Sequence, residues 1–334
     1  MKVLNITNGD GAANTIKQST VPGDVLPWRD PMHHGPFPKG LSLSELGPLR
    51  AEYLAGPDAD ATDAKRDFQL RDRHLEAVAN YDKVTLWFEH DLLDQLQILQ
   101  ILDWCSRAPL EDTQLAMICI DRYAEKPDFR GIGQLDADQM ASLVPLEQPV
   151  TETMLALAAV GWAAFRSNDP RDLLTFLDSD LRELPFLADA LRRHCEEFPN
   201  AATGLTRTEM QVLSLIGERV CSPRDLFLKN MDMETALFIG DWPTYQVIDA
   251  LCAAGLAMCE PSPFRFPSFT SEVPPAFDAQ RVSLTDVGRQ VLSGERDAFD
   301  LVRRDGWLGG VEITSSDALW TWNKDVAQFA RRTL

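Results

Sequence analysis

The sequence predicts an α/β protein that begins with a three-layer domain, in which helices cover a parallel sheet of about four strands. Short apolar runs rich in β-branched residues occur near residues 2–7, 23–28, 84–88 and 115–120. Stretches with helical apolar periodicity separate these runs, as the crossovers of a parallel sheet require. Each run ends at polar residues, and the carboxyl ends of parallel strands meet at one edge of the sheet. Open α/β sheets bind their ligands at that edge.

The size of the chain predicts more than one domain. Its 334 residues exceed what one ordinary hydrophobic core supports. Hydrophobic residues make up 45% and charged residues 25% of the chain, which is the composition of a folded globular protein. We divide it into an α/β ligand-binding domain at 1–148, a helical segment at 149–200, and a winged-helix-like domain with an aromatic C-terminal hairpin at 201–334.

The net charge and the cysteine spacing limit the classes of binding partner and the cellular compartment that we expect. A net charge of −19 repels polyanions, which weighs against nucleic acid and anionic membranes as partners. The apolar start is too short for a signal peptide, and no segment approaches the ~20 apolar residues of a membrane-spanning helix. The six cysteines are scattered without the spacing of a zinc site, so we expect free thiols. We therefore expect a cytoplasmic protein without membrane attachment.

The first predicted strand, at residues 2–7, is followed by a turn and a helix that starts near residue 12. The turn holds Asn8, Gly9 and Asp10. A glycine-bearing turn that leads into a helix exposes backbone amides, which suit an anion. In the structural alternative, Asp10 caps the helix and the glycines only form the turn.

The second predicted strand, at residues 23–28, leads into a polar loop. The loop carries Arg29, Asp30, His33 and His34, and prolines restrict its backbone. A rigid polar loop after a strand is suited to gripping a substrate. The alternative is a surface turn whose histidines are solvated. Two charged helices are expected between residues 42 and 81.

The central stretch runs from an apolar strand into Glu89, His90 and Asp91, and a helical pattern follows directly. Asp91 stands where a helix N-cap should be, with Asp94 three residues later, so a capped helix explains these two residues. It does not explain Glu89 and His90, which prolong the strand. The next strand, at 115–120, ends at Asp121 in the same way.

The C-terminal part predicts three helices followed by two strands and a further helix, the order of a winged helix. The helix expected to read DNA, at residues 241–254, offers two aspartates and one glutamine near its start, and no cation. DNA-reading helices bring cations to phosphates, so this composition favours packing or protein contact. Residues 307–322 resemble one hairpin with Trp320 and Trp322 on the same side, which favours a domain core or an interface.

Four stretches resemble a known family. They are residues 6–10 (ITNGD), residues 28–30 (WRD) with the Gly-Pro that follows, residues 87–95 (WFEHDLLDQ) and residues 131–135 (GIGQL). Together they resemble the bacterial family catalogued as domain of unknown function 1835, and the C-terminal parts are similar to those of its longer members. The resemblance implies an architecture and no reaction. The family pattern often has one histidine before the Gly-Pro, so either His33 or His34 can be its counterpart.

The residues support two hypotheses of function. In the first, the protein is a metal-dependent enzyme for phosphotransfer or phosphoester hydrolysis on a small phosphorylated or nucleotide-like ligand. Carboxylate groups at the ends of the strands would hold Mg²⁺, with Asp121 as a further candidate ligand. Arg29 and the backbone amides of the turn at residues 8–9 would bind phosphate. A histidine would act as general acid or base. The predicted catalytic residues are His90, Glu89 and Asp91, the predicted metal ligands are Asp10, Glu89 and Asp91, and the predicted ligand-binding residues are Asn8, Gly9, Asp10, Arg29, Asp30, His33, His34, Asp94 and Gln95.

The second hypothesis is a non-catalytic sensor or adaptor. Its α/β domain binds a small ligand, and its acidic winged helix contacts a protein partner or a second copy of the chain. A DNA-binding regulator is a third reading, and it requires a basic face that residues 241–254 do not provide.

Overall fold

The computed structural model describes residues 1–56, 60–110, 112–265, 276–314 and 318–333. They form two compact units. Unit 1 comprises Met1–Leu191 with Trp307–Glu312, and unit 2 comprises Arg192–Gly306 with Ile313–Leu334. The helices predicted as a segment of their own at 149–200 fall mostly in unit 1. No helix in the described part of the chain is both long and apolar enough to cross a membrane.

The sheet of unit 1 has five strands in the order β2-β1-β3-β4-β5. β1 to β4 are parallel, and the short β5 pairs antiparallel at one edge. The α/β class and the parallel sheet are therefore confirmed, with one edge strand more than predicted. The strand bounds are β1 (Val3–Asn8), β2 (Asp24–Trp28), β3 (Lys83–Glu89), β4 (Gln114–Ile120) and β5 (Gln148–Pro149).

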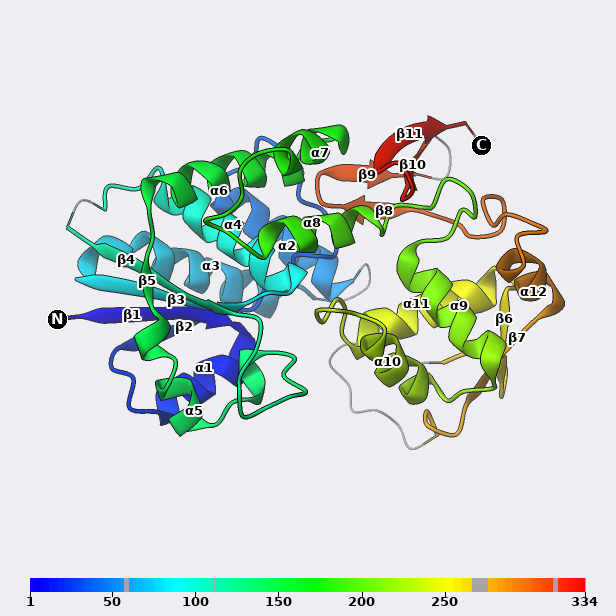
Figure 1. The fold of residues 1–334 in the computed structure, drawn as a ribbon, viewed down its shortest axis with the longest axis horizontal. Coiled ribbons are helices and arrows are strands. Elements are labelled where there is room, and N and C mark those ends of the chain that lie inside the picture. Colours follow the sequence, from blue (N-terminus) through cyan, green and yellow to red (C-terminus); the bar gives the residue numbers. More distant parts are fainter. Residues whose placement is uncertain (57–59, 111, 266–275, 315–317, 334) are drawn as a thin grey trace. The chain divides into compact units, whose positions relative to one another are not determined.

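Helices cover both faces of this sheet (Figure 1). α1 (Gly9–Gln18) and α5 (Ala137–Ala141) pack together on one face. On the other face α3 packs on β2 and α4 on β3, with α2 against α3 and α6 against α4. Apart from the first two, the helices of unit 1 are α2 (Leu43–Ala55), α3 (Thr62–Glu76), α4 (Leu92–Cys105), α6 (Glu152–Phe165) and α7 (Arg171–Leu177), with short 3-10 turns at Val78–Asn80, Ile132–Gln134 and Val144–Leu146.

The strand order reverses direction between β1 and β3. The connection after β1, through α1, leads to β2 on one side, whereas the connection after β3, through α4, leads to β4 on the other side. The two connections therefore diverge onto opposite faces of the sheet. Ligands of doubly wound sheets bind at such a reversal of the strand order, outside the carboxyl ends of the strands. Asn8 ends β1 and Glu89 ends β3.

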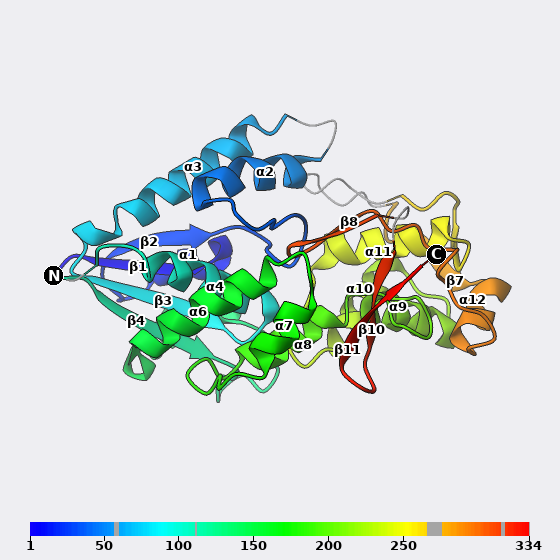
Figure 2. The same ribbon diagram turned by 90° about the horizontal axis from the view of Figure 1, so that it is seen from above.

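Unit 2 consists of helices and small antiparallel strand pairs. Within the described residues of this unit, α9, α10 and α11 precede the pair β6–β7, and α12 follows it. Figure 2 shows these four helices from a second direction. α8 (Leu187–Cys195) spans the boundary of the two units. The elements are α9 (Arg207–Glu218), α10 (Pro223–Asp232), α11 (Asp241–Ala253), β6 (Ala257–Glu260), β7 (Arg281–Leu284), α12 (Asp286–Leu292), β10 (Leu319–Asn323) and β11 (Gln328–Arg332).

The predicted pairing of the C-terminal strands is wrong. β8 (Gly306–Leu308) pairs with β9 (Val311–Ile313), and β10 pairs with β11, so residues 307–322 do not form one hairpin. A Gly-Gly turn between β8 and β9 lets these short strands pair with each other. Trp320 and Trp322 lie in β10 and are both buried.

A buried ion pair holds the loop after β2. Arg50 of α2 is fully buried, and its guanidinium donates to the Asp30 carboxylate at 2.6 and 3.0 Å. The same guanidinium donates to the carbonyl oxygens of His34 and Pro31. Gly35 has φ +76°, and a Cβ there would lie 2.5 Å from the Arg50 guanidinium. The loop is thus fixed from the interior.

Because the ion pair is buried, removing one partner should destabilise the folded state. We expect Asp30→Leu to lower the free energy of unfolding by about 3–5 kcal/mol, since Arg50 would keep a buried charge without a counter-ion. The double variant Asp30→Leu/Arg50→Met should lose clearly less than the sum of the two single variants. Urea denaturation measures both losses.

Asp67→Asn is the matched control, because it removes an exposed carboxylate that pairs with Arg29. This variant should lower the free energy of unfolding by no more than about 1 kcal/mol. The account of the loop fails if Asp30→Leu costs no more than this control.

Candidate functional site

Three carboxyl groups converge where the strand order reverses. Glu89 ends β3, Asp91 is the N-cap of α4, and Asp94 lies in the first turn of that helix. Oxygens of the three side chains lie within 4.8 Å of one another, and all three residues are buried. We call these residues the acid cluster. The predicted metal ligands were Asp10, Glu89 and Asp91. In the structure Asp94 takes the place of Asp10 in the set of possible metal ligands.

The local sequence explains the convergence. Asp91 accepts a hydrogen bond from the Asp94 amide at 2.9 Å, as expected of an N-cap. Asp94 in turn accepts from the Glu89 amide at 2.7 Å, which turns its carboxyl group back towards the end of β3. Gln95 donates to the Glu89 carbonyl oxygen at 2.8 Å and fixes the same junction. The predicted N-cap at Asp91 is confirmed.

Two further segments contact the acid cluster. Asn8, at the end of β1, donates its amide to Asp94 at 2.7 Å and to Glu89 at 3.2 Å. After β4, the backbone amide of Ile132 donates to the other Glu89 oxygen. A Cβ at Gly131 would lie 2.4 Å from the Glu89 carboxylate, so only glycine allows this approach. The predicted ligand set did not include residues 131 and 132, although both belong to the stretch 131–135 (GIGQL) that contributes to the family resemblance.

Burial makes ionisation of the acid cluster unfavourable. It raises the pKa of Glu89 to about 8, and the nearby Asp91 adds to the shift. Burial also raises the pKa of Asp91 to about 6, and that of Asp94 well above its usual value, with repulsion by the other two acids contributing to the latter. Within the described residues, no lysine or arginine forms an ion pair with these carboxyl groups. The folded state therefore favours the neutral forms of these carboxyl groups.

His90 is the predicted proton-transfer residue, and it lies between Glu89 and Asp91 in the chain. Its Nδ1 is closed to solvent and has no hydrogen-bond partner among the residues that the structure describes. Its ring packs edge-on against Phe186, with the ring centroids 6.1 Å apart. Asp121 pairs with Arg122 on the surface, and that ion pair, with a smaller contribution from His90, lowers the pKa of Asp121.

Asp10 and Arg29 pair with each other instead of joining the acid cluster. Arg29 donates to Asp10 at 2.8 Å and to Asp67 of α3 at 2.8 Å, and all three side chains are substantially exposed. The hydrogen bond from Arg29 lowers the pKa of Asp10. α1 begins at Gly9, not near residue 12, and its N-cap is Asn8. Asp10 therefore does not cap the helix, and it occupies the first turn instead.

The remaining predicted residues belong to the loop that Arg50 holds. The Asp30 carboxylate forms the buried ion pair with Arg50. His33 and His34 have their rings 4.3 Å apart, centroid to centroid. Burial, with repulsion by Arg50, lowers the pKa of His34 to about 4, so its imidazole is neutral at physiological pH. The structure thus separates the predicted set into the acid cluster with Asn8 and Gln95, the surface pair Asp10–Arg29, and this loop.

Comparison of the chain with models of known protein families and with curated proteins finds no match to either. The resemblance to the family of domain of unknown function 1835 stays a prediction.

The raised pKa of Glu89 predicts how stability depends on pH. The folded state favours the neutral carboxyl group, so this contribution is complete below the usual pKa and is lost as pH rises from 4.5 through about 8. Glutamine cannot ionise. With EDTA present, we expect the unfolding free energy of Glu89→Gln, relative to the unsubstituted chain, to increase between pH 5 and 8 by at most about 1.4 kcal/mol per pH unit.

Asp121→Asn is the control, because the pKa of Asp121 is lowered and the group stays ionised over this range. Its difference from the unsubstituted chain should be flat between pH 5 and 8. Urea denaturation at each pH provides the measurement. A flat difference for Glu89→Gln as well would contradict the account of the acid cluster.

Proposed function

We propose that unit 1 holds a divalent cation at the acid cluster and uses it in phosphotransfer or phosphoester hydrolysis on a small phosphorylated or nucleotide-like ligand. One observation carries the proposal. Three buried carboxyl groups meet at the point where doubly wound sheets bind ligands, and no basic side chain of the described chain pairs with them.

The donor set fits a hard cation. Mg²⁺ and Mn²⁺ prefer carboxylate oxygens, and Glu89, Asp91 and Asp94 offer three such groups from two adjoining elements. A cation would also remove the cost of ionising them. Bound there, it would supply charge for a phosphoryl group and lower the pKa of a bound water.

The surroundings fit a phosphorylated ligand. α1 and α4 both begin at this edge of the sheet, and helix N-termini favour anions. His90 lies between Glu89 and Asp91 in the chain, and its imidazole would accept or donate a proton during the reaction. Asn8 would orient Glu89 and Asp94, since it donates to both.

The composition of α11 favours a second candidate, a non-catalytic sensor or adaptor. The order of α9, α10, α11, β6 and β7 supports the winged helix predicted from the sequence, in which α11 would take the position of the DNA-reading helix. Asp241–Ala253 contains two aspartates and neither lysine nor arginine. Such a helix suits contact with a protein partner or a second copy of the chain, whereas DNA phosphates would repel it. In this reading the acid cluster binds its ligand without turnover, in a cytoplasmic protein.

Metal binding and turnover can be tested separately. Mg²⁺ or Mn²⁺ should raise the melting temperature, because a cation at 100 times its Kd adds about 2.7 kcal/mol to the free energy of unfolding. Asp94→Asn should abolish the shift. Asp103→Asn is the matched control, because Asp103 is a buried acid of the same helix that pairs with Arg107, and this variant should keep the shift.

A nucleotide panel with a phosphate-release assay then separates the two candidates. Metal-dependent release that His90→Ala and Glu89→Gln reduce at least about 100-fold supports the enzyme. Ligand-induced stabilisation without release supports the sensor. A shift with metal that is the same in Asp94→Asn and in the unsubstituted chain would remove the acid cluster as the site and overturn both versions.

A further inference from the structure

The segment after β4 carries a half-buried aromatic ring close to the acid cluster. Phe129 packs against a hydrophobic cluster that contains Ala12 of α1 and Ile132. Ile132 is the residue whose backbone amide donates to Glu89. Phe129 precedes Gly131 by two residues, so the Cα atoms of these two residues lie within about 7 Å of each other. An aromatic ring is therefore available near the carboxyl groups.

Two exposed glycines flank the same segment. Gly11 lies in the first turn of α1, three residues after Asn8, and Gly133 directly follows Ile132. α1 packs against the 3-10 turn that contains Gly133. Neither glycine has a positive φ, and a Cβ at either position would meet no atom within 4 Å. Within the described part of the chain, no contact or backbone angle therefore requires glycine at these two positions.

Two neighbouring glycines differ, because the protein itself requires them. Gly9 has φ +48°, and a Cβ at Gly131 would lie 2.4 Å from the Glu89 carboxylate. Gly11 has no such reason, and alanine is the better helix former. Glycine also lets a ligand approach the backbone closely. Bare backbone at Gly11 and Gly133 leaves room for a ligand beside the two segments that contact the acid cluster.

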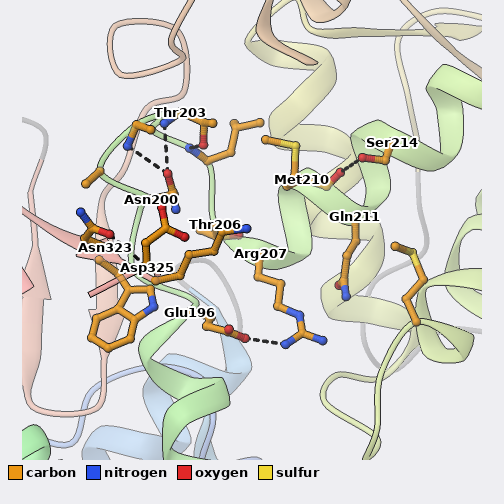
Figure 3. Close-up of a pocket in the computed structure, with 16 residues that line it drawn as sticks. Glu196, Asn200, Thr203, Thr206, Arg207, Met210, Gln211, Ser214, Asn323 and Asp325 are labelled. Carbon is orange, nitrogen blue, oxygen red and sulfur yellow. Dashed lines mark hydrogen bonds and ion pairs between the residues drawn. The ribbon is translucent and has the colours of Figure 1, made fainter. Parts of the chain in front are cut away.

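The pocket of about 620 Å³ in unit 2 has a different kind of lining (Figure 3). Arg207 pairs with Glu196, and Ser214 donates to the Met210 carbonyl oxygen. The Asn200 side chain accepts hydrogen bonds from two backbone amides. These polar groups are paired within the protein, so they select no class of ligand.

An aromatic side chain next to bare backbone suits a flat heterocycle. A nucleic-acid base stacks on an aromatic side chain through its π-face, whichever base it is. In the proposed function, the cation at the acid cluster would hold the phosphate of the ligand. A nucleotide carries both a phosphate and a base, whereas a sugar phosphate has no aromatic ring to stack.

We propose that the ligand of the acid cluster is a nucleotide whose base stacks on Phe129 and passes close to the backbone of Gly11 and Gly133. These three residues then determine specificity for the base. The inference rests on the function proposed for unit 1, and it selects nucleotides from the wider class of phosphorylated ligands.

The test compares the nucleoside monophosphates of adenine, guanine, cytosine and uracil with ribose 5-phosphate, which has no base. Isothermal titration calorimetry with the full chain and Mg²⁺ measures each Kd. At least one nucleotide should bind about tenfold tighter than ribose 5-phosphate, which corresponds to about 1.4 kcal/mol. Phe129→Leu keeps an apolar side chain without the ring. It should remove most of this ratio and leave the Kd of ribose 5-phosphate unchanged.

Gly11→Ala and Gly133→Ala test the close approach of the base. Each should weaken nucleotide binding about tenfold, because the added methyl group would occupy the space of the ligand. Neither should lower the free energy of unfolding, since neither Cβ meets a protein atom. Such a loss of affinity without a loss of stability is not expected of glycines with a structural role alone.

Tyr123→Leu is the control for the ring. Tyr123 packs against the same hydrophobic cluster, but its hydroxyl group shares a hydrogen bond with Ser142 at the end of α5. Gly240→Ala, in unit 2, is the control for the added methyl group, because Gly240 is also open. Both controls should change the Kd of the nucleotide less than about twofold.

The outcomes separate this inference from the function on which it rests. If Mg²⁺ raises the melting temperature but ribose 5-phosphate binds as tightly as every nucleotide, the inference is overturned and the metal site stands. The same holds if no nucleotide binds, if Phe129→Leu leaves the ratio unchanged, or if neither glycine variant weakens binding. Absence of the Mg²⁺ shift would overturn the proposed function and this inference together.

Discussion

The structure of unit 1 depends on one electrostatic constraint, which is that three buried carboxyl groups within 4.8 Å cannot all ionise without a counter-charge. Each negative charge would lose its hydration and repel the other two. The protein offsets only part of this cost, with hydrogen bonds from Asn8, Ile132 and backbone amides of α4 and β3. Hydrogen-bond donors favour the ionised form of a carboxyl group. No basic side chain of the described residues, however, forms an ion pair that would neutralise the resulting negative charge.

The same constraint explains why nearby acids have other partners. Asp30 has Arg50, with Arg71 3.8 Å away, and Asp10 has Arg29. Guanidinium groups thus pair with these acids, whereas none in the described residues pairs with the acid cluster. A purely structural network of buried acids would gain from a basic partner, as Asp30 does. The acid cluster therefore differs from the neighbouring Asp30 and Asp10, because each of these has an arginine partner and the acid cluster has none among the described residues.

Local patterns were sufficient to predict the sheet and part of the site. The run that ends at Glu89 and the spacing of Asp91 and Asp94 identify a strand followed by a capped helix, because both features depend on adjacent residues. The partners of Asp10 and Asp30 could not be predicted in this way. Asp67 and Arg50 lie in α3 and α2, and only the packing of these helices brings them to the loop. The unexpected pairing of β8 with β9 has the same origin, since strand pairing depends on tertiary context.

In the proposed function, a divalent cation would compete with protons for the acid cluster. With the pKa of Glu89 at about 8 and that of Asp91 at about 6, the cluster is partly protonated near neutral pH. A divalent cation must displace these protons, so its affinity should rise with pH across this range. Asn8 and the Ile132 amide hold Glu89 in place in either state. The loop at Gly131 contacts the same carboxylate, so a change of charge at Glu89 would act directly on that loop.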